Sequence, residues 1–175
     1  MTPLRERIVD ALPSLRRYAC ALVGNRRTGD RYIRIALDVL SQEPWRVQIC
    51  DDVKFELYKA FHDALGARFI FDSDPPEDWD DADPHHSVKR GLLDLPLVNR
   101  KLLLLVTLEG FSLKRAAELV QLPEREATLR FVRAHMELRC LTGASPVGSR
   151  GKSFKQEFQE AASQLAWRLA SETYH

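Results

Sequence analysis

The densest group of side chains that could do chemistry lies in residues 71–86, FDSDPPEDWDDADPHH, which hold seven carboxylates, no lysine or arginine and two adjacent histidines. Carboxylates and imidazoles bind metal ions, so His85 and His86 beside aspartates form a candidate metal site. The same segment contains three prolines, and no third ligand on a rigid element accompanies the histidines. We therefore interpret these side chains as solvated linker residues and expect no metal and no cofactor.

Other chemistry is not indicated. The sequence contains no nucleophile elbow, phosphate-binding loop, HExxH motif or carboxylate pair on a rigid element, so we expect no enzyme. Cys20, Cys50 and Cys140 are far apart and form no CxxC motif, which favours buried, reduced thiols. No apolar run approaches the roughly 20 residues that span a membrane, and the N-terminus lacks a signal peptide's apolar segment. These features predict a cytoplasmic protein.

The charge is nearly balanced overall but unevenly distributed. The 175 residues carry a formal net charge of +1, and 45% are hydrophobic, enough for a packed core. Residues 1–70 hold 12 basic and 9 acidic side chains, and residues 87–145 hold 10 basic and 6 acidic ones. Two mildly basic segments thus flank the acidic linker.

Apolar residues three or four positions apart predict helices throughout, and no stretch alternates with period two. In residues 1–70 we expect Pro13 to separate a first helix from a second and Gly24 to end the second. A third helix is expected over 29–42 and a fourth over 51–67. These elements predict a first helical lobe, which the linker 71–86 joins to a second.

The second lobe, residues 87–142, has the pattern of a helix-turn-helix. A short helix, VKRGLLDL, precedes Pro96, and a helix over 96–109 follows. Ser112 is placed to cap the short helix LKRAAELV, and a turn at Gln121-Leu122-Pro123 leads to a longer helix over 124–139. Residues 143–175 are expected to form a linker and an amphipathic helix. Its apolar stripe, which would pack on a lobe, a second chain or a partner, consists of Phe154, Phe158, Ala161, Leu165 and Leu169.

The second lobe carries the more specific family motif. Its segment LPLVNRKLLLLVTLEGFSLKRAAELVQLP resembles region 4 of extracytoplasmic function sigma factors, and LPSLRRYACALVGN resembles the start of region 2. The region 4 positions that match are Leu95, Pro96, Arg100, Glu109, Gly110, Phe111, Ser112, Ala116, Ala117 and Pro123. The resemblance covers about residues 4–140. It implies an all-α fold of two lobes, one like sigma region 2 and one like the region 4 helix-turn-helix.

The residues that such sigma factors use on polymerase and DNA are altered. Where the family has an acidic, polar run, Asp-Leu-Val-Gln-Glu, this chain has Arg31 to Ile35, RYIRI, so that Arg31, Arg34 and Ile35 replace an acid, a Gln and a Glu. This change reverses the charge of a surface that faces polymerase. In the recognition helix, Glu126 would repel phosphates, and Thr128 and Leu129 replace a cation and a hydroxyl.

The chain keeps the residues of both sigma-like cores but changes the surfaces that would bind polymerase and DNA. In this respect it resembles the sigma-like output module of PhyR-type anti-anti-sigma factors. That family has a Gly-Asp-x-Tyr-Val pattern, which Gly29, Asp30, Tyr32 and Ile33 match with Ile for Val. The resemblance implies a sigma-factor mimic that binds a small helical anti-sigma protein of the NepR type and so releases the true sigma factor in a general stress response. The receiver domain of PhyR-type proteins has no counterpart in residues 141–175.

The resemblance implies apolar partner-binding patches on both lobes. The expected contact residues are Tyr32, Ile35, Val39, Leu102, Val106, Leu129 and Val132. Little or no specific DNA binding and no membrane association are expected. The alternatives are a divergent sigma factor that binds RNA polymerase and promoter DNA, for which the remaining Arg130, Arg133 and Arg139 speak, and another helix-turn-helix regulator.

Overall fold

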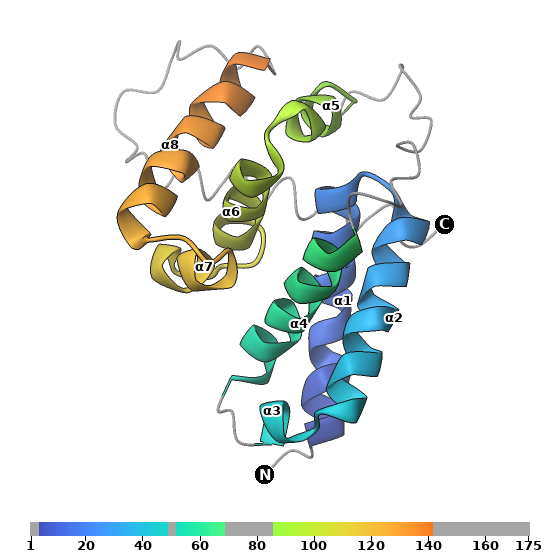
Figure 1. The fold of residues 1–175 in the computed structure, drawn as a ribbon. Coiled ribbons are helices and arrows are strands. Elements are labelled where there is room, and N and C mark those ends of the chain that lie inside the picture. Colours follow the sequence, from blue (N-terminus) through green and yellow to red (C-terminus); the bar gives the residue numbers. More distant parts are fainter. Residues whose placement is uncertain (1–3, 49–51, 69–85, 142–175) are drawn as a thin grey trace. The chain divides into compact units, whose positions relative to one another are not determined.

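The described part of the chain is helical and falls into two compact units. The computed structural model describes residues 4–48, 52–68 and 86–141, and every regular element within them is a helix (Figure 1). The first unit lies within Met1–Glu77 and the second within Asp78–His175. The acidic linker, apart from His86, and the C-terminal amphipathic segment lie outside the described residues.

Helix α1, Leu4–Val23, is a single helix that contains Pro13, so the predicted break at this proline was wrong. Proline removes one backbone donor and usually bends a helix. Here its ring is on the exposed side, while the next turn buries Leu15, Tyr18 and Ala19 in the core. Burial on the opposite face holds the helix together across the proline, an effect of packing that the local sequence does not reveal.

Helix α2, Arg26–Gln42, begins earlier than predicted because Asn25 caps it. The Asn25 side chain accepts a hydrogen bond from the Thr28 backbone N–H at 3.0 Å. Gly24, with a φ of 79°, ends α1 as expected and donates to the Cys20 carbonyl. The turn between α1 and α2 is therefore tight, and the two helices pack against each other.

Helix α3, Trp45–Gln48, is a single turn that was not predicted, and helix α4, Val53–Arg68, matches the expected fourth helix within two residues. Helices α1, α2 and α4 pack together around one core (Figure 1). Its largest fully buried side chains include Leu15, Tyr18, Leu22, Leu57, Tyr58, Phe61 and Leu65. The Tyr18 hydroxyl lies 2.8 Å from Nε2 of the buried His62, so this buried hydroxyl has a hydrogen-bond partner.

The second unit contains α5 (His86–Asp94), α6 (Leu97–Thr107), α7 (Leu113–Leu119) and α8 (Glu124–Leu141). Ser112 caps α7 as predicted, accepting from the Arg115 N–H at 3.3 Å. Helix α8 packs against α5, α6 and α7, and its inner face buries Ala127, Ala134 and His135. Helices α7 and α8, with the turn at residues 120–123, confirm the predicted helix-turn-helix.

Candidate partner-binding surfaces

The Gly29-Asp30-x-Tyr32-Ile33 motif packs α2 against α1. A Cβ atom on Gly29 would lie 3.3 Å from backbone and side-chain atoms of Ala19, so only glycine fits here without displacing α1. Tyr32 is 2% exposed and Ile33 is 5% exposed, which places both in the core. Tyr32 is therefore corrected from a surface contact to a core residue, because its position on α2 faces α1 and α4.

Asp30 completes this motif with an ion pair to α1. Its two carboxylate oxygens accept from Nε and Nη2 of Arg16 at 2.8 and 2.7 Å, a bidentate arrangement. The hydrogen bond from Arg16 lowers the pKa of the Asp30 carboxyl from its ordinary value, and nearby Arg26 and Arg34 add to the effect against the opposing cost of burial. Asp30 is thus held ionised.

Replacing Asp30 with asparagine should cost below about 1 kcal/mol at neutral pH, because both partners are partly exposed and solvent screens the pair. A carboxyl whose pKa is lowered by folding stabilises the protein above its unfolded pKa, and this contribution is lost as pH falls through the folded pKa. Urea denaturation of both proteins between pH 7 and pH 2.5 measures the difference. It should shrink below about pH 4, and a constant difference would contradict the ion-pair explanation.

The outer face of α2 combines arginines with half-buried apolar side chains. Arg31 and Arg34 are exposed, and so are Arg26 and Arg27 at the start of the helix. Ile35 and Val39, one turn apart, are partly exposed on α2. Because Arg16 neutralises Asp30, the first half of α2 presents positive charge where a working sigma factor is expected to be acidic.

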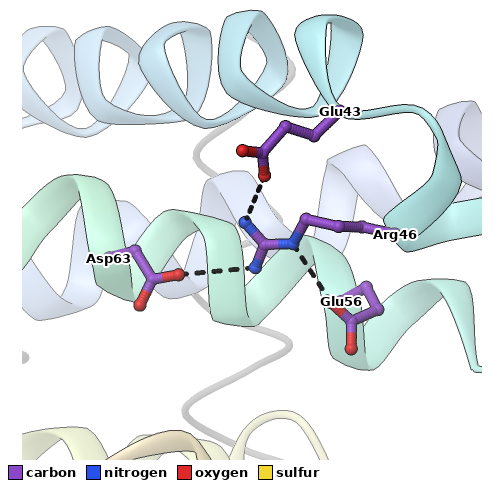
Figure 2. Close-up of polar contacts among 4 residues, drawn as sticks. All are labelled: Glu43, Arg46, Glu56 and Asp63. Carbon is purple, nitrogen blue, oxygen red and sulfur yellow. Dashed lines mark hydrogen bonds and ion pairs between the residues drawn. The ribbon is translucent and has the colours of Figure 1, made fainter.

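Beyond α2, Arg46 forms an ion cluster that the sequence did not predict. Its guanidinium lies 3.3 Å from Glu43, 3.7 Å from Glu56 and 3.4 Å from Asp63 (Figure 2). Figure 2 shows it between the end of α2 and the side of α4. The cluster fixes the connection between these helices. Glu43 is three residues from Arg46, but Glu56 and Asp63 lie on α4, so local spacing indicates at most one of the three ion pairs.

Arg46→Met should destabilise the first unit by about 1 kcal/mol, because three carboxylates lose a cation that is only 20% exposed. The loss should decrease as salt rises, since screening weakens the partly exposed pairs. Urea denaturation followed by circular dichroism at low and high salt measures it. Arg27→Met, which removes an exposed arginine of α2, is the control and should change little. Equal losses in both variants would contradict a role for the cluster.

Exposed apolar side chains lie on α8, on the helix that the resemblance to sigma factors implies would meet DNA. Glu126 accepts from Nε of Arg130 at 2.8 Å, and the Glu126 oxygen lies 2.7 Å from Nη2 of the same arginine. The Thr128 hydroxyl donates to the Glu124 carbonyl at 2.8 Å, within its own helix. Leu129 is 66% exposed, Val132 39% and Met136 61%. Three exposed apolar side chains therefore lie on this helix. Arg130 and Arg133 both pair with glutamates of the same helix, Arg133 with Glu137 at 3.5 Å.

Leu102 is fully buried in α6, so it is a core residue and not a surface contact, whereas Val106 on the same helix is partly exposed. Cys140 is exposed on α8, so the expectation of buried thiols was wrong for this residue, while Cys20 is partly buried. Among the described residues, no group of three histidine, cysteine, aspartate or glutamate side chains is placed to hold a metal ion.

A helix long and apolar enough to cross a membrane is not found within the described ranges.

Comparison with known proteins matches both units. A family model described as the Sigma2 domain of PhyR matches residues 8–62. The Phyllosphere-induced regulator PhyR of Methylorubrum extorquens is 41% identical over 54 residues, which is 31% of this chain and 20% of that protein. The chain thus aligns with about a fifth of this relative's length.

Solved structures extend the match to most of the chain. The PhyRSL–NepR complex from Sphingomonas sp. Fr1 matches with a TM-score of 0.65 and 27% identity, covering 87% of this chain and 99% of that one. The sigma factor RpoE of Bartonella quintana, solved in complex with the anti-sigma factor NepR, has a TM-score of 0.68 at 16% identity. It covers 81% of this chain and 97% of that one.

The two helical units, the second with its helix-turn-helix, define the fold of a sigma-like protein. Within that class, residues 8–62 match the Sigma2 domain of PhyR, and most of the chain is similar to the PhyRSL structure solved with NepR. Fold similarity extends to a true sigma factor as well, so the backbone does not separate mimic from sigma factor. The side chains on the outer faces of α2 and α8 have to make that distinction.

Proposed function

We propose that this protein is a sigma-factor mimic that acts in the bacterial cytoplasm. It binds a small helical anti-sigma protein of the NepR type through α2 and α8 and so releases the true sigma factor in a general stress response. It is a binding protein and not an enzyme. The proposal is supported by the likeness to a PhyR domain whose solved structure is a complex with NepR.

The observation that carries the proposal is the surface of α8. A helix that reads promoter DNA needs cations and hydroxyls directed at phosphates and base edges. This helix instead presents Leu129, Val132 and Met136, and its Glu126 occupies Arg130. An apolar stripe with positions three and four residues apart is suited to an amphipathic partner helix.

Calorimetric titration of the chain with a NepR-type protein tests the proposal, beside a binding assay with promoter DNA over a range of salt. We expect submicromolar protein binding and only weak DNA binding that salt abolishes. Specific promoter binding with core polymerase, and no anti-sigma binding, would overturn the proposal.

The second candidate function is a divergent sigma factor, and one observation favours it. Arg125 and Arg133 are exposed on α8, so some cations still face outward, although Arg133 also pairs with Glu137 at 3.5 Å. The charge of α2 speaks against this function, because Arg31 and Arg34 replace residues that would meet polymerase. Adding core polymerase to the assay above separates the two functions.

A further inference from the structure

The second unit has a stripe of exposed apolar side chains on the outer face of α8. Leu129, Val132 and Met136 are spaced by three and four residues, so they lie along one side of the helix. Cys140 continues the stripe and is exposed. A stripe this apolar on a helix of a folded protein indicates a surface that something covers.

The chain's own C-terminal segment has a stripe of matching length. Phe154, Phe158 and Leu165 are spaced for one face of a helix. In an antiparallel arrangement a single register pairs Leu129 with Leu165, Met136 with Phe158 and Cys140 with Phe154. The large aromatic side chains of this segment then meet the part of α8 where Met136 is 61% exposed.

Chain length and charge are consistent with this pairing. Residues 142–152 connect the end of α8 to the segment, and a connector of this length reaches roughly 35 Å when extended. Two packed helices are only about 8–10 Å apart, so the segment can turn back onto α8. Arg133, whose side chain is 75% exposed and pairs with Glu137 at 3.5 Å, borders the α8 stripe. Glu157 and Glu160 flank Phe158 in the segment and offer it carboxylates.

We propose that residues 153–170 dock as an amphipathic helix, antiparallel to α8, and cover Leu129, Val132 and Met136 within the same molecule. The docking depends only on the two stripes. One consequence rests on the proposed function: the docked segment occupies the face of α8 that an anti-sigma protein would use, so it acts as an internal competitor.

Hydrogen–deuterium exchange of the full chain, without any partner, tests the docking. The amides of residues 153–170 should exchange at least tenfold more slowly than an unstructured chain. The double variant Leu129→Glu, Met136→Glu should abolish this protection, because buried carboxylates are unfavourable and repel Glu157 and Glu160. Both positions are more than half exposed, so the lobe should still fold, and protection of α6 amides checks this.

Val9→Glu is the matched control, since Val9 is 55% exposed but lies on α1 in the other unit. It should leave the protection of residues 153–170 unchanged. Coil-like exchange of these residues in the unmodified chain would overturn the proposal, and so would protection that survives the double variant. Protection that grows with protein concentration would also overturn it, because the segment would then dock on a second copy.

A separate experiment addresses the competition. Adding a NepR-type protein should release the segment and raise its exchange at least tenfold. If the segment is protected alone and the added protein does not bind at all, the proposed function fails while the docking stands. If the added protein binds and the segment stays protected, the competition fails.

Discussion

Replacing Ile35 and Val39 with aspartate should weaken binding of a NepR-type protein at least a hundredfold. The two side chains are partly exposed and adjacent on the outer face of α2, which suits them as anchors for a partner helix. Carboxylates in an apolar contact stay unpaired and desolvated, and central interface residues commonly contribute about 2–4 kcal/mol each. A loss of about 2.8 kcal/mol corresponds to the hundredfold change. Calorimetric titration measures it directly.

Two controls separate a lost contact from a lost fold. Val9→Asp places the same charge on an exposed apolar position of α1, 55% exposed, and should leave the affinity unchanged. Because Ile35 and Val39 are half-buried, the milder pair Ile35→Ala, Val39→Ala is measured as well and should weaken binding about tenfold with little loss of helix content. Affinity that survives both α2 pairs would remove α2 from the binding surface.

The same α2 face offers a test of charge. Arg31 and Arg34 are exposed, whereas the resemblance to sigma factors implies an acid and a Gln at these positions. Arginines at these positions are compatible with a mimic, since a mimic does not have to bind polymerase. Under the proposed function, the charge of α2 and the apolar face of α8 have one explanation: neither surface is constrained by polymerase or by DNA.

The lobes and the helix-turn-helix were predictable because periodicity and capping are local signals. Ser112 and Gly24 marked helix ends correctly, and both are residues with a specific role at such ends. The predicted helix break at Pro13 was wrong because burial of the opposite helix face outweighs the proline's local tendency to interrupt a helix. The single turn of α3 escaped notice because four residues are too few to show a period.

The exposure of the expected contact residues was only partly predictable. Leu129 and Val132 were expected to be surface contacts and are exposed, while Tyr32 and Leu102 proved to be core residues. An apolar residue on a helix can face either way, and its side is decided by the helices packed against it. Met136 was not predicted, although its spacing of four from Val132 was a signal that could have found it.

Arg100, one of the residues that match the sigma region 4 motif, connects α6 to the end of α5 in the second unit. It is 8% exposed, and its Nη2 donates to the carbonyl of Leu93 and, at 3.0 Å, to that of Leu95. These carbonyls lie at and just beyond the end of α5, where a helix leaves its last acceptors unsatisfied. Burial lowers the pKa of the Arg100 guanidinium from its ordinary value, because removing this charge from water is unfavourable. The two carbonyls offset that cost by accepting its hydrogen bonds.

Arg100→Met should therefore destabilise the second unit by about 3 kcal/mol. The side-chain volume is nearly kept, but two acceptors at the end of α5 lose a charged donor, and each such loss costs about 1.5–3 kcal/mol. Hydrogen exchange of the buried α6 amides reports this unit alone, and they should exchange roughly 150-fold faster. Arg125→Met, at an exposed position on α8, is the matched control and should leave exchange unchanged. If α6 exchange is the same in both variants, Arg100 does not hold α5 against α6, and the sigma-like arginine would need another explanation.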